Sequence, residues 1–301
     1  MCVHYGYMRT KQVINMTLSD ELLKAIDKQA EVELRNRSEL IREAVRAYLL
    51  NKNANEIHQT FTTDESNRVR DIVNFSDFSE ATTLALSCSF RPQPNKIEGL
   101  FAGSDSDLIK YIENPKSFRN MGWDLRTLGR AIPVAGEHLQ ITNGDRKIIR
   151  VYRDGQIVFA ASEDFFGHGM EVEAEEATKI FKFNSMASAE VISNFTNFSL
   201  EIAKHLSIEP TGLVYKVRIF NPKRKHLELI SLGTFRDKMG ELTLDYADRE
   251  IFIIVDKSSP ENIAYNIWAE LNYLFGVSED HFSFVKKEEK LMNFEEFTKK
   301  Q

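Results

Sequence analysis

Four side chains near the start of the chain alternate with a period of two and could recognise the edges of base pairs. Asparagine can form two hydrogen bonds to an adenine edge, threonine can hydrogen-bond either base type, and valine can contact a thymine methyl group. The four residues are Lys11, Val13, Asn15 and Thr17. Between them stand Gln12, Ile14, Met16 and Leu18, mostly apolar side chains that would occupy the opposite face of a short strand.

The pattern changes to helical spacing directly after this strand. Ser19 is a suitable N-cap, and two acidic residues after it favour the positive end of a helix dipole. After a break, Asn36 and Glu39 form a variant of the capping box that opens a second helix. Each predicted helix has one apolar stripe, with Leu22, Leu23, Ile26 and Ala30 in the first and Leu40, Ile41, Ala44, Val45, Tyr48 and Leu49 in the second.

One strand and two short helices cannot bury enough apolar surface by themselves. The strand also has no partner for its backbone hydrogen bonds within its own unit. Two copies would solve both problems, because their strands could pair across a twofold axis into an antiparallel ribbon above interlocked helices. We therefore expect residues 9–52 to form a homodimer, which could assemble further on DNA.

This strand–helix–helix pattern resembles the ribbon-helix-helix family of DNA-binding proteins. The resemblance lies in VINMTLSDELL and in NRSELIREAVRAYL, and the second segment is similar to the DNA-binding half of nickel-responsive repressors. It implies that the paired strands enter the major groove of double-stranded DNA, where Lys11, Val13, Asn15 and Thr17 would read bases. Many family members have a basic or polar residue where this chain has Val13.

The start of the second helix offers a phosphate-binding site. Free backbone N–H groups at a helix N-terminus attract anions, and a positively charged side chain there strengthens the contact. The predicted phosphate contacts are Asn36, Arg37 and Ser38. The alternative is that residues 9–52 serve only for dimerisation.

Charge is distributed unevenly between the two parts of the chain. The 301 residues include 39 basic and 45 acidic ones, a net charge of −6, whereas residues 9–52 have a net charge of +2 and the remainder −8. This distribution limits nonspecific attachment and directs the basic part to DNA. With only two cysteines, no secretory leader pattern and no long apolar run, we expect a cytoplasmic protein without a disulfide framework.

The predicted fold class is α+β, with the ribbon-helix-helix module followed by a mixed α+β body. Residues 53–80 are polar and predict a linker with one helix over 64–73, and residues 81–301 form the body, which could comprise two subdomains, 81–170 and 171–301. Three strands over 138–142, 147–153 and 156–160 are separated by Asn-Gly and Asp-Gly turns and predict an antiparallel meander. Further predicted strands cover 82–90, 97–102, 212–220, 227–232 and 249–255, and predicted helices cover 188–206 and 260–275.

The body contains no recognised catalytic signature. It lacks a P-loop, a nucleophile elbow and zinc-ligand spacing, so we predict no enzyme, cofactor or metal site. Asp164, His168, Glu171 and Glu173 could be drawn as an acid–base or metal cluster, but the neighbouring glycines more simply indicate a loop. The body also lacks the clustered histidines and nearby cysteine that a nickel sensor would need.

These observations together predict a sequence-specific DNA-binding protein, a transcriptional repressor whose body binds a ligand or protein effector. One alternative is an antitoxin-like or defence-associated autoregulator whose body binds a partner protein. The other is an enzyme tethered to DNA by its head, which a buried polar cluster with shifted ionisation in the body would favour.

Overall fold

The computed structural model describes residues 23–28, 63–73, 78, 81–94, 97, 100, 107–119, 122–127, 129–143, 146–167, 180–222, 226–231, 238–242 and 246–295. It divides the chain into two compact units, Met1–Phe61 and Thr62–Gln301. In the first unit the described residues are helical, and Leu23 and Ile26 are half-buried there. They lie within the first helix predicted from the apolar spacing.

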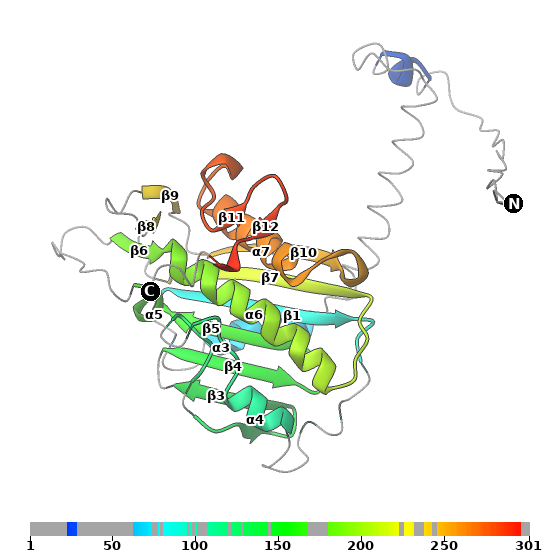
Figure 1. Cartoon of the computed structure of the whole chain (residues 1–301), viewed down its shortest axis with the longest axis vertical. Helices are drawn as coiled ribbons and strands as arrows, with labels where there is room; N and C mark the ends of the chain where they lie inside the picture. Colours follow the sequence, from blue (N-terminus) through cyan, green and yellow to red (C-terminus); the bar gives the residue numbers. More distant parts are fainter. Residues whose placement is uncertain are drawn as a thin grey trace, which may run out of the picture. The chain divides into compact units, whose positions relative to one another are not determined.

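A seven-stranded antiparallel sheet forms the centre of the second unit (Figure 1). Its strand order is β10-β7-β1-β5-β4-β3-β2. In chain order the strands are β1 (Thr83–Arg91), β2 (Ile132–Val134), β3 (His138–Asn143), β4 (Lys147–Tyr152), β5 (Ile157–Ser162), β7 (Gly212–Phe220) and β10 (Tyr246–Ile254). The predicted meander is confirmed as β3, β4 and β5, which pair in sequence order.

The central strand β1 is buried along its whole length and joins early and late parts of the chain. Thr83 pairs with Ser162 of β5 on one side and with Phe220 of β7 on the other. Residues 81–170 and 171–301 therefore contribute to one continuous sheet, and the structure does not separate them into two subdomains.

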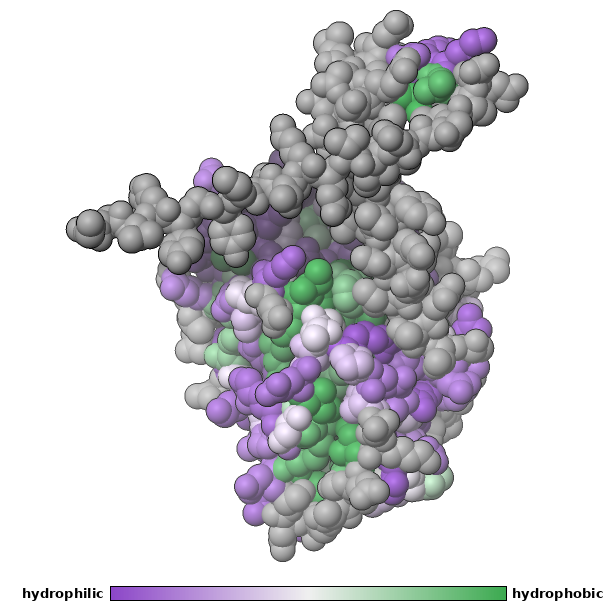
Figure 2. All heavy atoms as spheres, turned by 90° about the vertical axis from the view of Figure 1, so that its right-hand side faces the viewer, coloured by the Kyte–Doolittle hydropathy of each residue, from purple (hydrophilic) through white to green (hydrophobic). Residues whose placement is uncertain are grey.

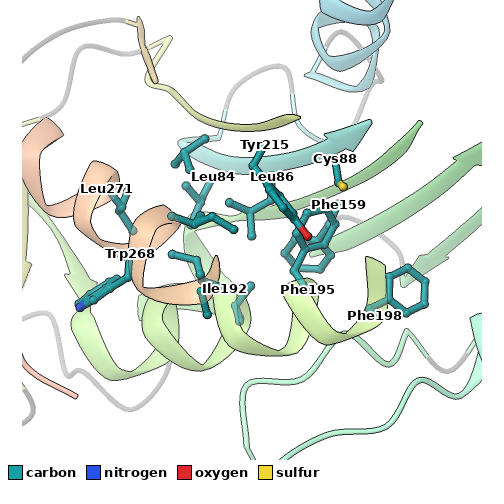
Figure 3. Packing of buried hydrophobic residues seen from close by; sticks show 14 of the residues in the cluster. Leu84, Leu86, Cys88, Phe159, Ile192, Phe195, Phe198, Tyr215, Trp268 and Leu271 are labelled. Carbon is teal, nitrogen blue, oxygen red and sulfur yellow. The ribbon is translucent and has the colours of Figure 1, made fainter. Parts of the chain in front are cut away.

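Three helices cover one face of the sheet: α4 (Asp107–Glu113), α6 (Ser185–His205) and α7 (Pro260–Leu274). Asn184 caps α6 by accepting hydrogen bonds from two backbone N–H groups, and Ser259 caps α7 with Pro260 in its first turn. Figure 3 shows Phe195 of α6 and Tyr215 of β7 in the layer between helices and sheet, and Trp268 of α7 beside the helices. This layer is the main core of the unit.

Helix α3 (Thr63–Val73) packs on the opposite face. Its buried Val69 and Ile72 contact the apolar side chains of β1, β4 and β5, among them Ala85, Ile148 and Val158. The helix was predicted at this position, but the segment 53–80 was expected to be linker. The described residues of that segment, 63–73 and 78, instead belong to the second unit.

Polar contacts hold α3 to the sheet as well. Glu65, fully buried, forms an ion pair of 3.2 Å with Arg91 Nη2 of β1. Arg218 Nη1 of β7 donates a 2.9 Å hydrogen bond to the backbone oxygen of Ser66. Arg68 forms a 2.5 Å ion pair with Asp154 in the turn after β4. The polar sequence of α3 suggests an exposed helix, but ion pairs and hydrogen bonds to residues distant in the chain attach it to the sheet.

Two smaller sheets complete the described part of the second unit. In one, β6 (Ile180–Asn184) pairs in parallel with β8 (His226–Ile230), which pairs with β9 (Lys238–Leu242); the other is formed by β11 (Val285–Lys286) and β12 (Leu291–Met292). Strands β2, β6, β9, β11 and β12 were not predicted. The strand predicted over 97–102 is wrong at Leu100, which has 3-10 geometry.

One side of the second unit shows a band of hydrophobic side chains with hydrophilic ones on both sides (Figure 2). Among the described residues, the exposed large hydrophobic side chains are Ile132, Ile254 and Tyr273. Single exposed apolar side chains of this kind are usual on soluble domains. We therefore assign no function to these three side chains.

We expect the second unit to lose stability in mild acid because of His138 on β3. Burial, reinforced by the positive charge of Arg150, lowers the pKa of His138 to about 4 from 6.5. Between these two values the unfolded chain binds a proton that the folded chain excludes, so stability falls as the pH decreases from about 6.5 towards about 4. Replacing His138 by Gln should reduce this pH-dependent loss by about 1–3 kcal/mol.

Urea unfolding of wild type and His138→Gln at about pH 7 and about pH 4.5 measures this difference. Other groups titrate in both proteins, so the comparison isolates the histidine. Identical losses in the two proteins would show that His138 is not the responsible group.

Candidate functional site

The residues predicted to contact DNA all lie outside the described residues. These are Lys11, Val13, Asn15, Thr17, Asn36, Arg37 and Ser38. The structure therefore neither brings them together nor separates them. They remain predictions from the sequence.

In the second unit, a pocket of about 470 Å³ opens at the end of the sheet where α5 (Glu163–Gly167) lies, on the left in Figure 1. One wall is formed by Gly122 and Trp123, which precede β2. Two polar residues are Asn143, the last residue of β3, and Arg146, which directly precedes β4. Lys147 at the start of β4, and Asp164 and Phe165 of α5, complete the lining.

A buried ion pair supports the wall that contains Trp123. Arg119 donates two hydrogen bonds to the Glu190 carboxylate of α6, of 3.1 Å from Nε and 2.6 Å from Nη2. The Glu190 side chain is fully buried and that of Arg119 is 7% exposed. The backbone N–H of Trp123 donates to the same carboxylate at 3.3 Å. Such a bidentate, charge-assisted contact fixes the orientation of the two side chains as well as the distance between them.

Gly122 is required by this arrangement. A Cβ added at Gly122 would lie 2.0 Å from Glu190 Oε1 and 3.0 Å from Arg119 Nε. The neighbouring carboxylate is held by the guanidinium and cannot move away cheaply. The absence of a side chain at position 122 thus allows the loop to pass directly over the ion pair.

The same loop is tied down from two further directions. Asn194, one turn after Glu190, donates to the backbone oxygen of Trp123 and accepts from the backbone N–H of Phe118, at 3.3 Å in both cases. On the other side, Lys147 Nζ donates to the backbone oxygens of Asp124, at 3.2 Å, and Arg126, at 2.5 Å. Trp123 Nε1 donates to the backbone oxygen of Phe165 at 3.2 Å and links the two aromatic walls.

Lys147 is an unusual cation because it is almost fully buried. Burial lowers the pKa of its ammonium group, and the nearby Asp124 carboxylate, 3.5 Å from Nζ, opposes this shift. The Phe165 ring centroid lies 4.8 Å from Nζ. With these partners, Lys147 supplies positive potential to the pocket and supports its wall.

A second buried polar cluster lies between α3 and β1. Burial raises the pKa of Glu65, whereas Arg91 lowers it. Glu65 lies on the face of the sheet that carries α3 and is not among the residues that line the pocket. The cluster joins the helix to the sheet, and its geometry indicates a structural role.

Three side chains of the small sheet have the spacing of metal ligands. The ligand atoms of His226, Glu228 and Glu241 all lie within 4.8 Å of one another. Lys238 Nζ lies 3.4 Å from Glu228 Oε1 and contacts the Glu241 carboxylate, and its hydrogen bond lowers the pKa of Glu241. Because a lysine ammonium already supplies the positive charge, we assign no metal site to this group.

The sequence predicted little of the pocket. Of its lining residues only Asp164 was considered, together with His168, Glu171 and Glu173, which lie outside the described residues. The one feature of the sequence that could have drawn attention to Glu190 is its position, because this acidic residue directly precedes the apolar stripe of α6. Its partner Arg119 is 71 positions away in the chain, and nothing in the sequence links the two.

The comparison with protein families concerns the first unit. Residues 12–52 match the family described as ribbon-helix-helix protein, copG family. No curated protein matches the chain. Among the described residues, no helix combines the length and apolar character needed to cross a membrane.

Proteins of the ribbon-helix-helix family bind DNA as dimers, and the family indicates a DNA-binding regulator or an antitoxin-type function. The match begins one residue after Lys11 and includes the other six residues predicted to contact DNA. Residues 12–52 of this chain are thus similar to ribbon-helix-helix proteins of the copG family.

Proposed function

We propose that this protein is a sequence-specific transcriptional repressor that binds double-stranded DNA as a homodimer through its first unit. The family match over residues 12–52 carries this proposal. The alternation of Lys11, Val13, Asn15 and Thr17 supports it, because these side chains would face the major groove when the opposite face packs on the helices.

The second unit serves in this proposal as a binding domain for an effector. It supplies a pocket with aromatic sides and exposed polar groups, and buried hydrogen bonds hold the wall that contains Trp123. Glu65 is a buried residue of α3 whose pKa is raised by burial, and it would favour a DNA-tethered enzyme only if it faced such a pocket. It faces the sheet instead and pairs with Arg91. We therefore propose a regulator in preference to an enzyme, and a small ligand in preference to the protein partner of an antitoxin.

Replacing Asn15 or Thr17 by Ala should weaken binding to the operator by about 1–3 kcal/mol where the lost contact is bidentate. Binding to a scrambled duplex should barely change, because base contacts contribute little to nonspecific affinity. The operator is first selected from a random duplex pool with the wild-type chain. Titration of each variant against operator and scrambled duplex then gives both affinities, and equal losses on the two would exclude base reading by these residues.

Arg37→Ala provides the matched contrast. As a phosphate contact it should weaken binding to operator and scrambled DNA alike and make the slope of log affinity against log salt shallower by about one unit. An unchanged slope would remove Arg37 from the phosphate contacts. Failure of the wild-type chain to enrich any duplex from the pool would overturn the proposed function.

A further inference from the structure

Three polar side chains around the pocket of the second unit are available to a ligand. These are Asn143, Arg146 and Asp164, and within the described residues none of their side chains takes part in a hydrogen bond or ion pair. Lys147, in contrast, is occupied by two backbone oxygens and Asp124. The pocket thus presents one cation, one carboxylate and one amide.

The two aromatic walls give this pocket an apolar side. Trp123 and Phe165 belong to different elements, the loop before β2 and helix α5, yet the Trp123 Nε1 hydrogen bond to the Phe165 oxygen joins them. Flat aromatic surfaces favour stacked or edge-on contacts with another ring. A volume of about 470 Å³ lies within the usual range for small-molecule sites.

The wall that carries Trp123 is rigid before any ligand arrives. The Arg119–Glu190 pair, the Asn194 amide and Lys147 fix the backbone from three directions. Four buried polar side chains are a costly way to hold a surface loop, since each must be desolvated. Fixing a binding surface in advance lowers the conformational entropy that the protein loses when a ligand binds.

We propose that this pocket binds a small zwitterion with an aromatic ring, of the aromatic α-amino acid class. The ligand carboxylate pairs with the Arg146 guanidinium, and its ammonium group pairs with the Asp164 carboxylate. Its ring packs against Trp123 and Phe165. A zwitterion can pair with Arg146 and Asp164 at the same time, whereas a ligand with one charge can pair with only one of them, which favours the zwitterion. The role as effector rests on the proposed function, whereas the binding itself does not.

The chain contains its own reporter for this site. It has two tryptophans, and Trp268 is fully buried in the core, whereas Trp123 lines the pocket. L-Phenylalanine is a suitable probe because its ring is not excited together with tryptophan. Titration into the full-length chain without DNA should change the tryptophan emission in a saturable manner. Trp123→Phe should abolish this change while the emission of Trp268 remains.

Three probes and two variants separate the two charge contacts. We use L-phenylalanine, 3-phenylpropionate, which lacks the ammonium group, and 2-phenylethylamine, which lacks the carboxylate, and follow binding by calorimetry. Arg146→Gln should weaken L-phenylalanine and 3-phenylpropionate about tenfold and leave 2-phenylethylamine unaffected. Asp164→Asn should weaken L-phenylalanine and 2-phenylethylamine about tenfold and leave 3-phenylpropionate unaffected.

Lys204→Gln, near the C-terminal end of α6, is the control for a general change of surface charge and should alter no affinity. Arg146 and Asp164 are exposed, so their variants should retain the thermal midpoint of the wild type. No saturable binding of L-phenylalanine at millimolar concentration would overturn the proposal. Equal weakening of all three probes in both variants would overturn it as well, because the charges would not be recognised separately.

The regulatory role is measured separately, by titrating the selected operator with and without saturating L-phenylalanine. A shift of operator affinity would make the ligand an effector. Ligand binding in a chain that binds no DNA would overturn the proposed function alone. Operator binding in a chain that binds none of the three probes would overturn this inference alone.

Discussion

Replacing Glu190 by Leu is expected to lower the free energy of unfolding of the second unit by about 3–5 kcal/mol. The change leaves the buried Arg119 without its carboxylate and removes the acceptor for the Trp123 backbone N–H. An uncompensated buried charge is costly because it has lost water as well as its partner. Urea unfolding followed by far-UV circular dichroism, at one protein concentration, measures the loss.

The double variant Arg119→Met, Glu190→Leu is the control for this prediction. With both charges removed the site becomes apolar, so most of the stability should return. Its wall, however, should remain less ordered, and Trp123 emission should shift relative to the wild type. A single Glu190→Leu variant as stable as the wild type would contradict the assignment of the pair as the support of the loop.

Trp268→Ala should also destabilise the second unit by about 3–5 kcal/mol. Trp268 of α7 is fully buried (Figure 3), and its Nε1 donates a 3.1 Å hydrogen bond to the Ser283 oxygen. Removing the indole leaves a cavity and an unsatisfied backbone oxygen. The same urea titration measures the effect.

Two substitutions test whether the loss comes from burial. Tyr273→Ala, on the same helix but 43% exposed, should cost about 0.5–1 kcal/mol. Trp268→Phe keeps an aromatic ring and should cost less than Trp268→Ala. Similar losses for Tyr273→Ala and Trp268→Ala would mean that helix propensity, and not core packing, dominates at α7.

Local signals in the sequence predicted those elements whose partners lie close in the chain. The Asn-Gly and Asp-Gly turns predicted the meander of β3, β4 and β5 because hairpin pairing depends on adjacent strands. The Ser259 cap and Pro260 predicted the start of α7. In these places backbone preference, apolar pattern and tertiary contacts all favour the same structure.

Elements held by distant polar partners could not be predicted in the same way. Helix α3 has few apolar residues, and its attachment depends on Glu65 and Arg68 finding Arg91 and Asp154. The pocket wall depends on Arg119 finding Glu190. A charged residue in a sequence indicates a solvated surface until its partner is known, so the linker prediction and the omission of the pocket have one cause.

The position of β1 in the sheet has a consequence for folding during synthesis on the ribosome. Its pairing with β5 becomes possible once the meander has emerged, but its other edge must wait for β7, whose Phe220 pairs with Thr83. At about 5–20 residues per second, synthesis from Thr83 to Phe220 takes roughly seven to twenty-seven seconds. Throughout that interval a strand destined for complete burial presents an unpaired edge. The speed of translation between β1 and β7, or a chaperone that covers nascent strands, should therefore affect the fraction of chains that reach the native state.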